Sequence, residues 1–169
     1  MALPRFLAVI GLKVKELLPI NSSAGAGDAE KLIATNALGQ IDQSFFPAGI
    51  GSATFIRPAS EALSAGDFVN MHDNAGVSNA RKADNTSYKP ADGFVLAAVG
   101  MGANATIFPL GEIVSGLTGL TPGSEYFLGT AGGLTLTPPT AAGAIFQRVG
   151  VALTDTTLST NRGLVVERT

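Results

Sequence analysis

The sequence predicts an all-β protein, a compact antiparallel β-barrel or sandwich domain that carries an extended N-terminal arm. Glycine and proline account for 21 and 9 of the 169 residues, and they are spread so evenly that few stretches could hold an ordinary helix. From Ser52 onward, turn residues recur about every 8 to 12 residues, which is the spacing typical of a sandwich or barrel. The longest stretches that lack both residue types carry no helical period of apolar side chains.

Composition excludes several classes of protein. Hydrophobic residues make up 46% of the chain and charged residues 14%, which is too apolar for a disordered polymer. A formal net charge of −2 provides no basic field, so we expect no nucleic-acid partner. With Cys 0, disulfides and thiolate metal sites are excluded. The apolar run that starts at Phe6 is interrupted by Lys13 before it reaches the length of a signal peptide or a membrane helix, so no membrane partner is expected.

The chain divides by character into an apolar N-terminal arm (1–20), a linker with a short strand and a helical turn (21–51), and a β-domain (52–169). In the arm, Leu12 and Val14 alternate with lysines as in a strand exposed on one face, but helical spacing also fits, and both conformations stay open. The small residues of 21–27 separate the arm from any core. The arm is therefore either the first strand of the domain or, as we favour, a segment that docks on another subunit.

Each later element has its own signal. Residues 31–47 predict a short strand, a turn at Gly39 and one helical turn that Asp42 caps and Pro47 ends. Residues 67–71 and 77–82 predict a hairpin around a turn at 72–76. Further strands are expected at 93–99, 105–108, 110–114, 125–128, 134–137, 145–153 and 164–166. In 145–153, alternation places Ile145, Val149, Val151 and Leu153 on a buried face and Arg148 and Gly150 on the opposite face.

No pattern of residues predicts catalysis. Gly100–Ala105 imitates a dinucleotide-binding loop, but β-branched and aromatic residues follow it where a helix would have to begin, so it predicts a hairpin turn. His72 is the sole histidine, and its setting predicts an exposed loop position without the partners that a metal or a hydrolytic triad needs. We therefore expect a protein that is not an enzyme, with no catalytic residue, no metal or cofactor site and no small-molecule substrate.

Two parts of the sequence resemble segments of tailed-bacteriophage virion proteins. The first is 31–47, KLIATNALGQIDQSFFP. The second comprises 62–69, 81–84, 90–97, 119–128, 133–139 and 147–152, in that order and spacing. Together they resemble the capsid decoration, or cement, proteins, which are typically homotrimers seated where capsomers meet and carry no catalytic residues. Related modules also occur in tail fibres, which leaves a fibre or another phage appendage that binds a host receptor or glycan as the alternative.

The resemblance implies a head-decoration subunit that binds and stabilises the shell of major capsid protein. We expect it on the surface of the phage head, after synthesis in the cytoplasm of the bacterial host. Ordering a free arm costs about 1–2 kcal/mol per residue, so the arm must bury a large apolar area on its neighbour. The residues expected to make that contact are Phe6, Leu7, Val9, Ile10, Leu12, Val14, Leu17, Leu18, Phe45 and Phe46.

Overall fold

The computed structural model describes residues 5–10, 12–37, 39–46 and 54–169. The chain divides into two compact units, Met1–Gly51 and Ser52–Thr169, here called unit 1 and unit 2. Nearly all regular structure is β, and every pair of named strands is antiparallel. The predicted fold class is confirmed in its sandwich form, since the described strands close no barrel.

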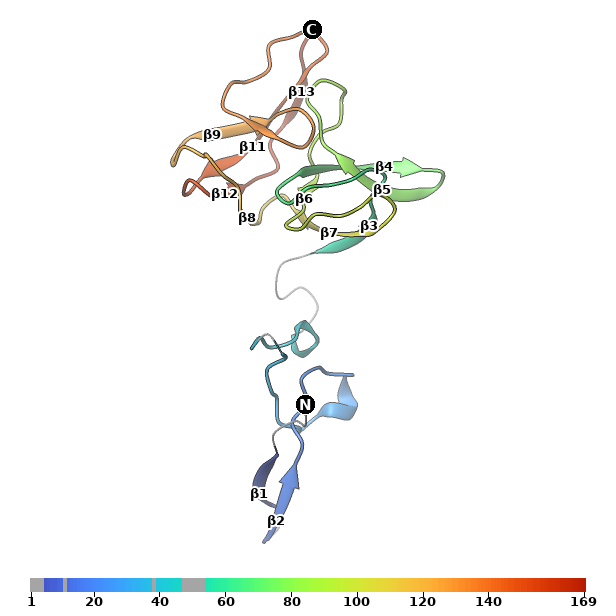
Figure 1. Ribbon diagram of the computed structural model, residues 1–169, viewed down its shortest axis with the longest axis vertical. Coiled ribbons are helices and arrows are strands. Elements are labelled where there is room, and N and C mark those ends of the chain that lie inside the picture. The colour runs from blue at the N-terminus through green and yellow to red at the C-terminus, as the bar shows by residue number, and fades with distance from the viewer. Residues whose placement is uncertain (1–4, 11, 38, 47–53) are drawn as a thin grey trace. The chain divides into compact units, whose positions relative to one another are not determined.

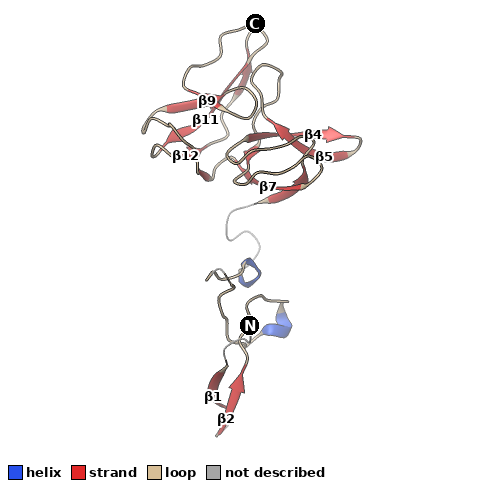
Figure 2. Ribbon diagram, in the orientation of Figure 1, coloured by secondary structure: helices blue, strands red, loops and turns tan. Residues whose placement is uncertain are grey.

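Among its described residues, unit 1 has one hairpin, two single helical turns and connecting loops (Figure 2). The hairpin joins β1 (Phe6–Ile10) to β2 (Lys13–Leu17), so the apolar segment is folded back on itself and is neither a helix nor a single extended strand. The helical turns are η1 (Ala26–Asp28) and η2 (Gln43–Phe45). Asp42 caps η2 as predicted, because its Oδ1 accepts the Ser44 N–H at 3.0 Å.

Two further expectations for unit 1 have different outcomes. The turn at Gly39 is confirmed, with φ 74° and its N–H donated to the Asn36 carbonyl. The short strand predicted after Lys31 is reduced to an isolated parallel bridge between Ile20 and Ile33. It stops there because one short bridge cannot supply the three or more strands that an independent sheet needs.

Unit 2 contains two antiparallel sheets (Figure 1). The five-stranded sheet has the order β3-β7-β6-β4-β5, and the second sheet has the order β10-β9-β11-β12-β8 with β13 paired to β11. Their strands are β3 (Phe55–Pro58), β4 (Phe68–Asn74), β5 (Val77–Lys82), β6 (Gly93–Phe94), β7 (Asn104–Pro109), β8 (Ile113–Ser115), β9 (Glu125–Leu128), β10 (Leu134–Thr135), β11 (Ile145–Ala152), β12 (Thr157–Thr160) and β13 (Val165–Glu167).

A first hydrophobic core lies between the two sheets. Phe68 of β4 and Phe94 of β6 enter it from one side, and Leu128, Ile145 and other residues of the second sheet enter from the other side. The Phe68 and Phe94 ring centroids are 6.1 Å apart. Burial of these apolar side chains away from water is the main favourable term in folding.

A second core lies on the other face of the five-stranded sheet. Side chains alternate across a strand, so Val69 and Val95, which follow Phe68 and Phe94, point into this second cluster with Ile107. Between the sheets, buried Gln147 of β11 makes two hydrogen bonds to Ala91. Its Oε1 accepts the Ala91 N–H at 2.8 Å, and its Nε2 donates to the Ala91 carbonyl at 2.9 Å. These hydrogen bonds join β11 of the second sheet to the segment just before β6 of the five-stranded sheet.

A β-bulge overturns the predicted face pattern of β11. The pairing with β9 shifts between Arg148 and Gly150, so Val149 is an extra residue. Ile145 and Val149 are buried as predicted, but Gly150 and Ala152 are buried as well, whereas Val151 is only half-buried and Leu153 is exposed. The prediction for Val151, Leu153 and Gly150 was wrong because one inserted residue exchanges the two faces.

Several strand bounds also differ from the predictions. The strand expected at 93–99 ends at Phe94, and 110–114 begins only at Ile113 because a turn occupies Gly111. The strand expected at 134–137 ends at Thr135, while β13 lies one residue later than expected. β3 and β12 lacked specific predictions. The hairpin is confirmed, with its turn narrowed to Ala75 and Gly76, so His72 lies in β4 and not in a loop.

Candidate partner-binding surface

Unit 1 has no hydrophobic core among its described residues. Both core clusters consist of residues of unit 2, and Pro19 is the single residue of unit 1 described as buried. Among the described residues, 11 of the 21 exposed large apolar side chains lie in unit 1, although this unit spans only Met1–Gly51. Exposed apolar side chains are therefore concentrated in the unit whose described residues form no core of their own.

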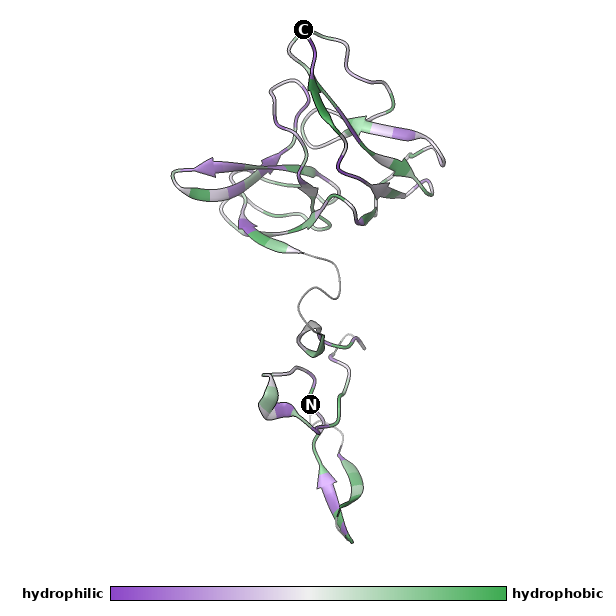
Figure 3. Ribbon diagram, turned by 180° about the vertical axis from the view of Figure 1, so that it is seen from behind, coloured by the Kyte–Doolittle hydropathy of each residue, from purple (hydrophilic) through white to green (hydrophobic). Residues whose placement is uncertain are grey.

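Six of these eleven side chains lie in the β1–β2 hairpin, whose ribbon Figure 3 colours by hydropathy. Directly opposed residues of an antiparallel pair share a face, so the register Val9↔Val14 and Leu7↔Glu16 defines one face, here called the aliphatic face. Leu7, Val9 and Val14 are 76%, 73% and 68% exposed. Three branched aliphatic side chains thus project together into solvent.

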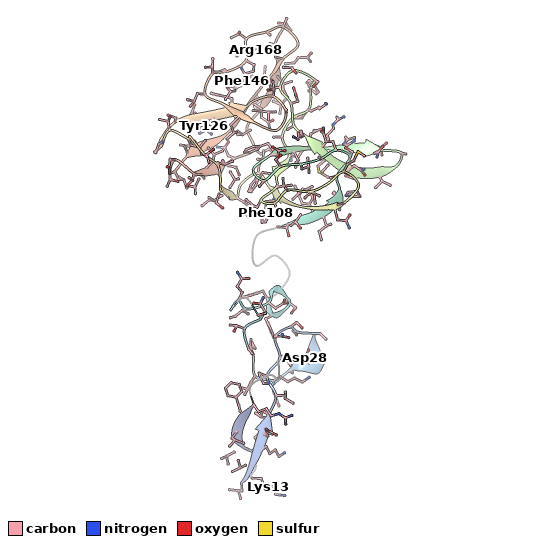
Figure 4. The ribbon with its side chains drawn as sticks, in the orientation of Figure 1. Lys13, Asp28, Phe108, Tyr126, Phe146 and Arg168 are labelled. Atoms are coloured by element: carbon pink, nitrogen blue, oxygen red, sulfur yellow. The ribbon has the colours of Figure 1, made fainter. Side chains whose placement is uncertain are left out.

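The opposite face, here called the lysine face, differs in charge. It contains Phe6, Ala8 and Ile10 of β1, opposed by Leu17, Lys15 and Lys13 of β2. Phe6 and Ile10 are 48% and 45% exposed. Lys13 lies at the turn end of the hairpin (Figure 4). The two ammonium groups give this face a positive charge.

The loops after the hairpin are held by short hydrogen bonds. The Asp28 carboxylate accepts Lys31 Nζ and the Ala24 N–H, each at 2.6 Å, and the hydrogen bond from Lys31 lowers the pKa of Asp28. The Ser23 N–H donates to Ser44 Oγ at 2.7 Å, and that hydroxyl donates to Asp42. The Ser44 hydrogen bonds lower the pKa of Asp42. These contacts join the described loop residues of 21–37 and 39–46 without adding a core.

The predicted contact residues are mostly exposed. Leu12 is fully exposed, Leu18 and Phe46 are about half exposed, and Leu17 and Phe45 are half-buried. The predicted contact set did not include Leu32, Ile33 and Ile41, which are exposed as well. The signal for them was present, since they too are apolar residues in a part of the chain that lacks a core. The contact of these ten residues with a partner stays a prediction.

In unit 2, four buried side-chain atoms have no hydrogen-bond partner among the described residues: His72 Nδ1 and the Oδ1 atoms of Asn79, Asn85 and Asn161. His72 is cross-strand from Asn79 in the β4–β5 hairpin, and Gly100–Ala103 is a turn that leads into β7, as predicted. Two hollows in unit 2 measure about 230 and 430 Å³. Ala65–Asp67, Gly116–Thr118, Leu120 and Gly132–Leu134 line the first, and Leu96–Val99, Asn104, Thr106 and Phe108 line the second. Asp67 is the one titratable residue among them, and Lys82 Nζ lies 3.3 Å from its Oδ2.

Within the described part of the chain, no group of three or more histidine, cysteine or acidic residues is placed to hold a metal ion. Its helical segments are all too short or too polar to cross a membrane.

A comparison with solved structures finds a match to the N base of the head fibre gp8.5 of bacteriophage phi29. The match has 14% sequence identity and a TM-score of 0.45, and it covers 67% of this chain and 97% of that chain. No protein-family model matches the chain, and a comparison with curated proteins finds no match.

Proposed function

We propose that the chain is a structural protein of a tailed-bacteriophage virion, a head-decoration subunit that binds and stabilises the shell of major capsid protein. The proposal rests on the exposure of unit 1. Its described residues expose their apolar side chains, and Pro19 is the one that is buried. An isolated two-stranded hairpin is marginally stable in water at best. A partner surface that covers the hairpin would supply the missing core.

The sequence supports the identity of that partner. The segment Lys31–Pro47 and the series of matching segments between residues 62 and 152 resemble decoration proteins, which are typically homotrimers on phage heads. Fully burying a Leu, Val, Ile or Phe side chain contributes about 1.5–3 kcal/mol, so the ten predicted contact residues could offset the cost of ordering the segment. Repetition over a symmetric shell would add avidity. The proposed protein is not an enzyme, and it acts without a cofactor, nucleic acid or membrane.

Co-sedimentation with purified capsid shells tests the proposal. The chain that lacks residues 1–20 should keep a folded unit 2 and lose co-sedimentation, because the hairpin is gone. Leu164→Ser is the matched control, since it removes an apolar side chain that is 78% exposed in unit 2. The control should sediment with shells like the unmodified chain. Unchanged co-sedimentation of the truncated chain would defeat the proposal.

Antibody labelling of whole particles separates the head from the tail. Under the proposal, electron microscopy places the label on the head surface. A label confined to the tail would replace the decoration role with the alternative from the sequence, an appendage that binds a host receptor or glycan.

A further inference from the structure

The smaller hollow of unit 2 has no part in the proposed shell binding. It measures about 230 Å³, and three loops line it, Ala65–Asp67, Gly116–Leu120 and Gly132–Leu134. Pockets for drug-sized molecules measure about 300–1,000 Å³, so this hollow suits a smaller ligand, of the size of one sugar ring. Among the described lining residues, Asp67 is the one that is titratable.

The fold uses one carboxylate oxygen of Asp67 and leaves the other free. Oδ2 accepts the Ser64 N–H at 2.7 Å and lies 3.3 Å from Lys82 Nζ. Oδ1 accepts no hydrogen bond from any described residue, although the side chain is only 15% exposed. A Cβ at Gly132 would lie 3.2 Å from Oδ1, so the missing side chain leaves room beside this oxygen. A ligand that donates hydrogen bonds could therefore pair with Oδ1.

The charge and polarity of the lining restrict the class of ligand. The ion pair with Lys82 offsets the charge of Asp67, so the described lining residues and Lys82 together carry no net charge. The side chains of Leu117, Leu120 and Leu134 add apolar wall to the hollow. A neutral sugar presents adjacent hydroxyl donors and apolar C–H faces, which match the carboxylate oxygen and the leucines.

Backbone hydrogen bonds fix the glycines that line the hollow. The Gly132 N–H donates to the Ala83 carbonyl at 2.7 Å, and the Gly132 carbonyl accepts the Phe68 N–H at 2.9 Å. The Gly66 N–H donates to the Val95 carbonyl at 2.8 Å. The hollow is therefore formed before a ligand arrives, which reduces the cost of ordering the loops on binding.

We infer that this hollow binds one neutral sugar residue, whose adjacent hydroxyls donate to Asp67 Oδ1 while a C–H face of the ring packs against the leucines. The inference goes beyond the proposed function, because it requires neither the β1–β2 hairpin nor a capsid shell. The sugar is a ligand and not a substrate. Most glycosidases need a pair of carboxyl groups, and the described lining residues provide only Asp67.

An NMR titration of the ¹⁵N-labelled full chain tests the inference. The probes are methyl α-glucopyranoside, methyl β-galactopyranoside and N-acetylglucosamine, with sodium acetate and methylammonium chloride as charged comparisons. We expect at least one sugar to shift the amide signals of Gly66, Gly116 and Gly132 saturably, and to leave the signal of Gly100, outside the hollow, in place. The absence of such a shift with all three sugars overturns the inference, as does equal or tighter binding of a charged probe.

Two variants locate the sugar. Asp67→Asn should weaken binding by about tenfold or more, because hydrogen bonds to a charged acceptor are among the strongest. Thr118→Phe should abolish binding, because it places a ring at an exposed position in the lining. Thr140→Phe is the matched control, since Thr140 is exposed and lies outside the lining.

Equal affinities of Thr118→Phe and Thr140→Phe for the sugar would contradict the assignment. This comparison stays decisive if Asp67→Asn fails to fold, because both threonines are exposed. Thr118→Phe should still co-sediment with capsid shells as the unmodified chain does. A failure of sugar binding is therefore distinct from a failure of shell binding.

Discussion

Gly150 lies in the bulge of β11, where the strand is paired on both sides by β9 and β12. A Cβ at this position would press against the backbone carbonyl oxygen of Ser159 and lie 3.1 Å from the side chain of Leu158. Backbone in a central strand cannot move aside without breaking its pairing. Glycine is therefore required here by close approach and not by a positive φ.

Gly150→Ala should lower the free energy of unfolding by about 1–3 kcal/mol, the usual cost of overpacking. Urea denaturation measures this change. Gly100→Ala is the matched control, since a Cβ there meets nothing within 4 Å and the φ of Gly100 is not positive. We expect the control to change stability by less than about 0.5 kcal/mol. Equal effects of the two substitutions would contradict the steric argument.

Asp84 stabilises the loop that begins after β5. Its Oδ1 accepts the N–H and the hydroxyl of Thr86 at 2.8 and 2.6 Å, and its Oδ2 accepts the Ala131 N–H at 3.0 Å. Desolvation raises the pKa of Asp84, but the hydrogen bonds from Thr86 and Ala131, together with the charge of Lys89, outweigh it and lower the pKa. The folded state therefore favours the ionised carboxylate.

A carboxylate whose pKa is lowered on folding stabilises the folded state. This stabilisation is fully present above the pKa of the unfolded chain, about 3.9, and it is lost as the pH falls through the lower pKa of the folded state. Asp84→Asn should thus cost about 1 kcal/mol at pH 7, and the cost should shrink as the pH falls below about 4. Urea denaturation at a series of pH values measures both quantities. Asp155→Asn, an exposed carboxylate between β11 and β12, controls for net charge. A cost independent of pH would contradict the assignment.

At the scale of elements, the β4–β5 hairpin turns on two residues with positive φ, Ala75 at 53° and Gly76 at 83°. This is the conformation of a type I′ turn, for which Asn-Gly is preferred. Alanine in the left-handed region is strained by its Cβ. Ala75→Asn should raise the free energy of unfolding by about 0.5–1 kcal/mol, and Ala75→Val should lower it, because β-branched residues are disfavoured at positive φ. Thermal unfolding checks both, and changes of the same sign would refute the turn assignment.

Sequence signals predicted the elements whose conformation is set by neighbouring residues in the chain. The β4–β5 turn follows from Gly76, and the helical turn after Asp42 follows from a capping side chain. The bulge at Val149 was not predictable. It depends on the register in which β11 pairs with β9, and residues near Val149 in the chain do not set that register. The β1–β2 hairpin escaped prediction because strand and helix periods both fitted its sequence. β3 escaped because Pro58 ends its run, and proline is tolerated there at the sheet edge.

The sequence also predicted that the apolar residues of the candidate surface are exposed. It did not predict how they divide between the two faces of a hairpin. Phe6, Leu7 and Val9 were singled out because 21–27 separates them from any core, and their exposure agrees with that reasoning. Their division into two faces needed the register of the hairpin, which places Val9 opposite Val14. Leu32 and Ile33 were missed because they read as a strand of a sheet, whereas Ile33 forms only a single bridge.

At the scale of the whole molecule, stability and the proposed binding role belong to different units. Both hydrophobic cores, and the hydrogen bonds between Gln147 and Ala91, lie in unit 2. In unit 1, the apolar side chains described are mostly exposed, and Pro19 alone is buried. Burial of apolar surface dominates the free energy of folding, so unit 2 should supply nearly all of it.

The fragment 54–169 should therefore unfold in urea as cooperatively as the full chain, with a free energy of unfolding within about 0.5 kcal/mol of it. The slope of that free energy with urea should also hardly change, because the slope follows the surface that unfolding exposes and unit 1 exposes most of its surface already. Matched concentrations of fragment and full chain are needed, since self-association stabilises the folded state by mass action. A loss of more than about 2 kcal/mol in the fragment, measured at concentrations where both are monomeric, would mean that residues 1–51 complete the core of unit 2, and the hairpin would then lose its independence as a binding element.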